Sequence, residues 1–191
     1  MDIRELDRRA LEHLDKIVAG IGTADLTLPT PCAGWDLGDL MRHQVSENNA
    51  FAVAARHGSA EDWNGGDLGE DPYEAYATSV RAVLAAFDDH GMLDRQVTIH
   101  DFGPFPGAVV VSMHFIDSIV HGWDLASTLD APYDPEPDLT AAALRIASQI
   151  PAGPDDRGAG KAFGAVVEVP GDSSDLDRVL GLLGRDPAWR P

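Results

Sequence analysis

The chain has 191 residues, of which 44% are hydrophobic, so it is long and apolar enough for one domain with a buried core. Its formal net charge is -18 and Lys16 and Lys161 are the only lysines, which argues against binding to nucleic acid or to an anionic membrane surface. It has no uninterrupted apolar window of about 18 residues and no signal-like N-terminus, and its single cysteine excludes an internal disulfide. We therefore expect a cytoplasmic protein that partners neither nucleic acid nor a membrane.

Apolar residues recur at three- and four-residue steps and predict several amphipathic helices. Asp36 is a favourable N-cap, and Asp39 supports the same helix start through the helix dipole. Pro72 opens a further helix, and glycines follow the ends of several others. In chain order, the long helices are expected at residues 2–19, 36–56 (counted from the N-cap), 72–90 and 108–128.

The other segments predict shorter elements. Residues 94–106 are expected to be extended, residues 151–161 to form a flexible connection rich in Gly and Pro, and residues 162–169 to form a strand or an extended arm. Short helices are expected at residues 138–150 and 175–183. These elements predict an all-α fold, with a four-helix bundle in residues 1–130 and a short C-terminal extension in residues 131–191 packed on the same domain.

The helix at residues 108–128 carries three ionisable side chains on one stripe. At about 100° per residue, His114, Asp117 and His121 lie within roughly 60° of one another. Imidazole and carboxylate groups on one helical face are typical of a divalent metal site, and the i, i+4 pair of Asp117 and His121 is the sharper signal. Asp124 extends the stripe and could orient an imidazole, or it could be a solvated carboxylate. The whole stripe could also be the polar side of an amphipathic helix.

A third ligand would have to come from another helix. His43 lies two turns into the helix that begins at Asp36, and Glu47 follows it at i+4 on the same face. His43 could meet His121 across a helix pair, with Glu47 as a supporting or additional ligand. Spacing alone leaves open whether His43 is a ligand or a histidine whose hydrogen bonds are satisfied within the fold.

Two segments together resemble a known family. The segment Thr30–His43 (TPCAGWDLGDLMRH) and the segment Asp117–Ala126 (DSIVHGWDLA) are similar to the DinB-like superfamily, and more closely to the metal-binding domain of mycothiol-dependent maleylpyruvate isomerases and their uncharacterised actinobacterial relatives. The tail Leu183–Trp189 (LGRDPAW) also resembles those relatives. The resemblance implies a DinB-like four-helix bundle that binds a divalent metal through His43, Asp117 and His121. Asp117 stands where the isomerases carry glutamate, so its carboxylate reaches less far.

The implied ligand set defines the chemistry to expect. Two imidazoles and one carboxylate suit zinc best and are also compatible with nickel, iron or manganese. Three protein ligands leave a coordination position open, where a bound water or thiol loses its proton more easily. The resemblance favours mycothiol as a co-substrate and a thiol-dependent transferase or isomerase acting on a small electrophile.

Two other functions remain open at this stage. The bundle could be a non-catalytic module that binds a metal or small molecule, or it could be a metal-dependent hydrolase. Hydrolysis needs a general base, for which Glu47, His114 and Asp124 are the candidates, and no catalytic residue is assigned. His114 would otherwise neighbour the site. Trp35 and Trp123 would line a pocket or pack in the core, and a homodimer is compatible with the sequence.

Overall fold

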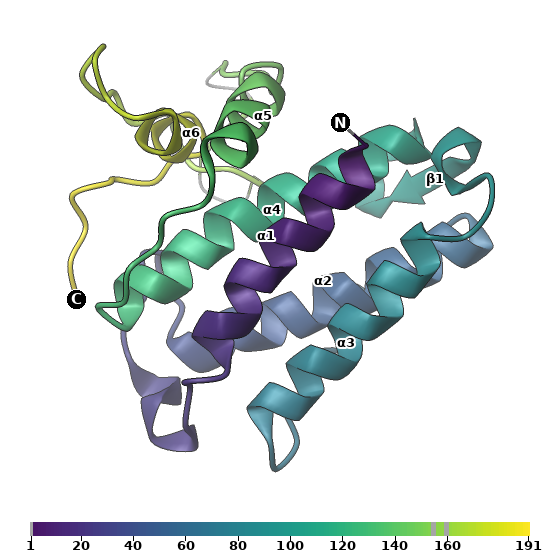
Figure 1. Cartoon of the computed structure of the whole chain (residues 1–191), viewed down its shortest axis with the longest axis horizontal. Coiled ribbons are helices and arrows are strands. Elements are labelled where there is room, and N and C mark those ends of the chain that lie inside the picture. The colour runs from purple at the N-terminus through teal and green to yellow at the C-terminus, as the bar shows by residue number, and fades with distance from the viewer. Residues whose placement is uncertain (1, 154–155, 159–160) are drawn as a thin grey trace.

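The computed structural model describes residues 2–153, 156–158 and 161–191, most of them in helices (Figure 1). The connection expected at residues 151–161 therefore lies partly outside the described residues. Short 3-10 helices occur at Thr23–Thr27, Met92–Asp94 and His100–Phe102. The main elements are the helices α1 (Ile3–Val18), α2 (Leu37–His57), α3 (Pro72–Phe87), α4 (Gly107–Thr128), α5 (Pro137–Ala147) and α6 (Asp175–Leu182), and the strands β1 (Gln96–Ile99) and β2 (Gly103–Pro106).

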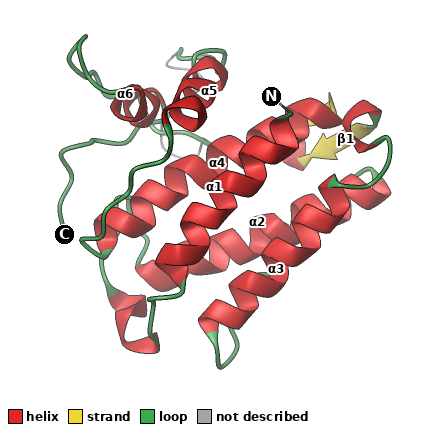
Figure 2. Cartoon of the chain, in the orientation of Figure 1, coloured by secondary structure: helices red, strands yellow, loops and turns green. Residues whose placement is uncertain are grey.

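The first four helices form the bundle that positions the site. Helix α1 packs along α4, helix α2 packs along α3, and α2 also contacts α4 (Figure 1). Helices α5 and α6 pack on each other, and α5 packs on α4, so the extension lies beside the bundle. Figure 2 shows how small the strand content is. The predicted all-α bundle with a short extension is confirmed.

Three apolar clusters hold the helices together. One joins α2, α3, the start of α4 and the hairpin, a second joins α1, α4, α5 and α6, and the third lies between α1, α2, α3 and the end of α4. Burial of such side chains is the main force that stabilises a helical bundle. The largest fully buried members include Tyr76, Phe87, Phe115, Leu14, Leu40 and Ile119.

The start of α2 confirms its sequence signal. The Asp36 side chain accepts a hydrogen bond from the Asp39 amide (2.8 Å), and the Asp39 side chain accepts one from the Asp36 amide (3.3 Å). This reciprocal capping box defines where the helix begins. The helix ends at His57 and is capped by Gly58, whose left-handed backbone (φ 88°) favours glycine. The start of the helix that carries His43 is thus encoded locally.

The extended segment predicted at residues 94–106 is an antiparallel hairpin in which β1 pairs with β2. Helix α3 ends at Phe87, earlier than expected, because residues 88–91 form the turn into this segment, with Gly91 in the left-handed region (φ 75°). Residues 162–169 form an arm rather than a strand, held where the Val167 amide donates to the Gly181 carbonyl (2.9 Å). Within the described ranges, none of the helices combines the length and the hydropathy that crossing a membrane would require.

Candidate metal centre

Helices α2 and α4 bring His43, Asp117 and His121 together. The Nε2 atom of His121 lies 3.3 Å from Asp117 Oδ1, and the Nε2 atom of His43 lies 3.8 Å from the same oxygen. The two imidazole rings are 4.9 Å apart between centroids. His121 is buried, whereas His43 and Asp117 are partly exposed. The cluster therefore lies at the edge of the bundle, with one side open to solvent.

The donor atoms have the spacing that one ion would need. Ligand atoms at about 2.1 Å from a tetrahedral zinc ion are about 3.4 Å from one another. The separations of 3.3 Å and 3.8 Å are close to that value, and one ligand atom from each residue lies within 4.8 Å of the others. The three residues therefore fit a divalent metal in both chemistry and spacing.

Gln44 orients Asp117 from the neighbouring helix. Its buried side-chain amide donates to Asp117 Oδ2 (3.1 Å), which leaves Oδ1 facing the two histidines. Sequence reasoning missed this contact. A glutamine next to His43 carries no spacing signal, because its role depends on how α2 packs on α4.

The second nitrogen of His121 faces the interior. His121 donates its Nδ1 hydrogen to Asp124 Oδ2 (2.8 Å), and Asp124 is fully buried. Burial raises the pKa of Asp124, but the hydrogen bond from His121 and the charge of Arg185 outweigh it, so the pKa lies below its usual value. An ionised carboxylate on one imidazole nitrogen holds the ring so that the other nitrogen can bind a metal. This contact is the one that an orienting role for Asp124 requires.

Cys32 joins the same interior contacts through a locally organised loop. The Thr30 hydroxyl accepts from the Cys32 amide (3.1 Å) and donates to the Trp35 carbonyl (2.9 Å), which shapes the turn before α2. This turn buries the Cys32 thiol 3.1 Å from Asp124 Oδ2 and 4.0 Å from His121 Nδ1. No local sequence pattern indicates these polar contacts of Cys32, because its partners lie far away in the chain.

Asp117 and His121 of α4 strongly influence each other's pKa. Burial opposes a charged imidazole, but the charge of Asp117 and its hydrogen bond raise the pKa of His121 well above its usual value. Burial likewise raises the pKa of Asp117, but His121 and then His43 together lower it well below the usual range. Without a metal the two therefore form an ion pair, so a metal has to displace a proton from His121.

Glu47 lies beside the cluster in a site that disfavours its charge. Its carboxylate is 4.0 Å from His43 Nδ1 and 3.5 Å from the Nε2 atom of His100. Burial, followed by the negative charge of Asp117, raises the pKa of Glu47 to about 8. A carboxyl group of this kind can hold a proton at neutral pH.

The two tryptophans lie in different surroundings. Trp35 is exposed, and its ring centroid is 5.0 Å from that of His43, so it forms a wall beside the cluster. Trp123 is buried and lines a separate cavity of about 240 Å³ together with Tyr133 and Trp189.

His114 does not join the cluster. Its ring is fully buried, Nδ1 contacts Asp7 Oδ1 (2.7 Å), and Nε2 contacts Asn48 Oδ1 (2.8 Å). Both nitrogens therefore have partners away from Asp117. The shared stripe on α4 hides this difference, because only helix packing decides which neighbour each side chain meets.

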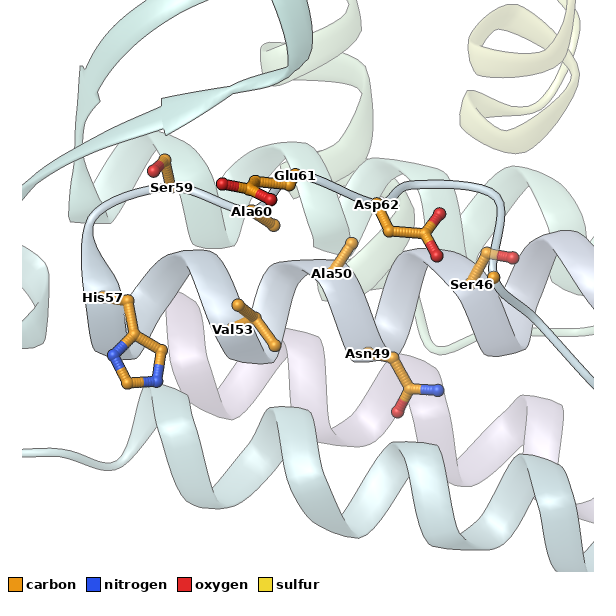
Figure 3. A pocket seen from close by; sticks show the side chains of 10 residues that line it. Ser46, Asn49, Ala50, Val53, His57, Ser59, Ala60, Glu61 and Asp62 are labelled. Carbon is orange, nitrogen blue, oxygen red and sulfur yellow. The ribbon is translucent and has the colours of Figure 1, made fainter.

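A larger cavity lies on another part of α2. It has a volume of about 570 Å³ between this helix and the loop that follows it, and its lining includes His57, Glu61 and Asp62 (Figure 3). The side chains lining it do not include the three residues of the cluster.

The fold and the site together define a class: helical bundles with a two-histidine, one-carboxylate cluster between two helices. The model of the mycothiol maleylpyruvate isomerase N-terminal domain family matches residues 8–126, more than half of the chain, and the protein belongs to this family. Two uncharacterised proteins from Mycobacterium tuberculosis, from strains CDC 1551 / Oshkosh and H37Rv, are each 28% identical over 185 residues, which is 97% of this chain and 98% of theirs.

Solved structures share the fold. The crystal structure of the mycothiol-dependent maleylpyruvate isomerase aligns with a TM-score of 0.64 at 14% identity, over 77% of this chain and 68% of that one. A mutant of the same enzyme in which one histidine is replaced by alanine aligns over the same shares with a TM-score of 0.61, also at 14% identity.

Proposed function

We propose that this cytoplasmic protein binds one divalent metal ion, zinc most favourably, through His43, Asp117 and His121, and catalyses a thiol-dependent isomerisation or transfer on a small electrophile. The observation that carries the proposal is the convergence of these three side chains from α2 and α4 within the family bundle. The names of the family and of the related enzyme support mycothiol as the thiol.

Residues around the metal would have separate roles in the reaction. A divalent ion with an open coordination position supplies Lewis acidity, which favours the deprotonated form of a thiol that binds it. Asp124 holds the imidazole of His121 in the tautomer that leaves Nε2 for the metal, and Gln44 holds Asp117. Glu47 is placed to hold or release a proton beside the cluster, and Trp35 would contact the substrate.

Metal content tests the site directly. Protein purified without an immobilised-metal column should contain about one equivalent of zinc or another divalent metal. His43→Ala should lose it, whereas His57→Ala, at the end of the same helix, should retain it. Added zinc should raise the melting temperature of the wild type but not of His43→Ala, because a ligand stabilises the state that binds it. Equal metal content in the two variants would exclude the proposed ligands.

Activity separates the proposal from its alternatives. With mycothiol and an electrophile such as monochlorobimane, the metal-loaded wild type should accelerate conjugate formation, and chelation of the metal should abolish the acceleration. Turnover of maleylpyruvate would identify an isomerase. Metal binding without any thiol-dependent rate would favour a non-catalytic module, and ester or amide cleavage without thiol would favour a hydrolase.

A further inference from the structure

The C-terminal tail reaches the metal cluster through Arg185, which follows α6. Its guanidinium donates from Nε to Asp124 Oδ1 (3.0 Å) and from Nη2 to Asp124 Oδ2 (3.0 Å). The same Nη2 atom lies 3.3 Å from Cys32 Sγ. One arginine from the extension thus contacts both interior neighbours of His121 at the same time.

These contacts matter because His121 could serve two different metal sites. Its Nε2 atom faces Asp117 and His43, whereas its Nδ1 atom faces Asp124 and Cys32. The second group, Cys32, His121 and Asp124, is buried and also has its donor atoms within 4.8 Å of one another. A cysteine, a histidine and an aspartate are suitable zinc ligands, and a thiolate is the softer donor.

The guanidinium lies within hydrogen-bond distance of two of the three donor atoms that an ion in this second group would need, Cys32 Sγ and Asp124 Oδ2. A divalent ion bound to Asp124 and Cys32 would lie within a few ångströms of a permanent positive charge in a buried setting, where repulsion is strong. It would also have to take Asp124 Oδ2 and Cys32 Sγ from the Nη2 hydrogen bonds.

We propose that Arg185 determines which face of His121 binds metal. By holding Asp124 with two hydrogen bonds, it keeps Nδ1 of His121 as a donor and directs Nε2 toward His43 and Asp117. By standing beside Cys32, it keeps metal away from the thiol site. Arg185 is a positioning residue, and this inference rests on the proposed metal site.

Cobalt(II) provides a test that does not depend on activity, because thiolate ligation gives an intense near-ultraviolet charge-transfer band that imidazole and carboxylate ligation lack. The wild type should bind Co²⁺ without this band. Arg185→Gln should bind about 10- to 100-fold more weakly at the open site, the usual cost of losing an orienting partner. At saturating Co²⁺ it should gain the band, and the added substitution Cys32→Ser should remove it.

Two further variants control the experiment. Arg178→Gln changes an exposed arginine of α6 that pairs with Asp175, so it should bind Co²⁺ as the wild type does. Arg185→Lys keeps the charge but loses the bidentate contact with Asp124. It should therefore bind Co²⁺ more weakly than the wild type without gaining the charge-transfer band. If circular dichroism of the metal-free protein shows that Arg185→Gln does not fold, Arg185→Lys still tests whether the contact of Arg185 with Asp124 affects metal affinity.

The outcomes separate this inference from the proposed function. If the wild type binds no Co²⁺, or binds it equally well after His43→Ala, the metal site itself is refuted, and the inference with it. If the wild type binds through His43 but Arg185→Gln and Arg185→Lys both bind with unchanged affinity and no band, only the role of Arg185 is refuted. If Arg185→Gln binds Co²⁺ more weakly but shows no charge-transfer band, the claim that Arg185 positions His121 stands. The claim that Arg185 keeps metal away from Cys32 is then refuted.

Discussion

His114 lies where side chains from all four bundle helices meet. It contacts Asp7 of α1 and Asn48 of α2, and the Asn48 amide donates to the Ser79 hydroxyl of α3 (2.9 Å). Asn48 presents its oxygen to Nε2 and Asp7 presents a carboxylate oxygen to Nδ1, an arrangement that favours a charged imidazole donating from both ring nitrogens. The network therefore contains a buried ion pair with an amide and a hydroxyl beside it.

This pair predicts a pH dependence of stability. Burial opposes the charged form, but the charge and hydrogen bond of Asp7 raise the pKa of His114 above 6.5. A raised folded-state pKa means that the stabilisation is complete below pH 6.5 and is lost as the pH rises through the raised value. Asp7→Asn should lower the free energy of unfolding at pH 6 by about 3 kcal/mol and should weaken its decline toward pH 8.5.

Urea unfolding of metal-free protein at several pH values measures this effect. Asp88→Asn, which changes an exposed partner of Arg8, is the matched control and should follow the wild-type curve. Parallel curves for Asp7→Asn and the wild type would contradict the ion pair.

The raised pKa of Glu47 predicts a second pH dependence of stability, which begins at lower pH than that of His114. Its pKa rises from 4.5 to about 8 on folding, mainly through burial, so the folded state keeps a proton that the unfolded state releases. Glu47 therefore does not lower the free energy of unfolding below pH 4.5, where it is protonated in both states. As the pH rises from 4.5 toward 8, its ionisation in the unfolded state lowers the free energy of unfolding. The metal-free Glu47→Gln protein, which is always neutral at this position, should lose less unfolding free energy between pH 5 and 8.

Chemical unfolding in the presence of a chelator would show this difference. Glu61→Gln, in the exposed loop after α2, should leave the slope unchanged. If Glu47→Gln retained the full wild-type slope, Glu47 would have to be ionised in the folded protein.

At the scale of elements, α4 is the helix on which the site depends. It lacks a side-chain N-cap and is apolar on most faces, so it is held by packing rather than by its own ends. Its first residue, Gly107, donates its amide to the Arg95 carbonyl (2.8 Å), and its Cα lies against the backbone of Met92. Glycine is required here because a Cβ atom would overlap the Met92 carbonyl oxygen.

Gly107→Ala should therefore destabilise the protein by about 1–3 kcal/mol, because the turn before β1 has to move away from the start of α4. Gly171→Ala is the control: no atom lies within 4 Å of its added methyl group, and the free energy of unfolding should change by less than about 0.5 kcal/mol. Thermal or urea unfolding of both variants measures the difference. Equal stability would mean that α4 and the 3-10 helix at Met92–Asp94 are not tightly packed.

For the whole molecule, the dominant electrostatic property is the formal net charge of -18. Such an excess of carboxylates destabilises the compact state by self-repulsion, whereas exposed ion pairs such as Arg81 with Glu74 contribute little. Raising NaCl from about 0.01 M to 0.2 M at pH 7.5 should raise the melting temperature, because the screening length falls from about 30 Å to less than 10 Å. The same salt change near the isoelectric point of about 4.4 should have little effect on the melting temperature. A drop in melting temperature at pH 7.5 would contradict destabilisation by self-repulsion.

Local sequence patterns predicted the helices, the N-cap at Asp36, the extended segment at residues 94–106 and the i, i+4 pair of Asp117 and His121, because each depends on residues a few positions apart. The sequence also carried the family resemblance that named His43. The packing of the helices, in contrast, places His114 against Asp7, away from the ligand residues on the same stripe. It also brings Gln44, Cys32 and Arg185 close to the proposed ligands. Such contacts join residues far apart in the chain, and their distances depend on how α1, α2 and the C-terminal tail pack on α4, which no local pattern encodes.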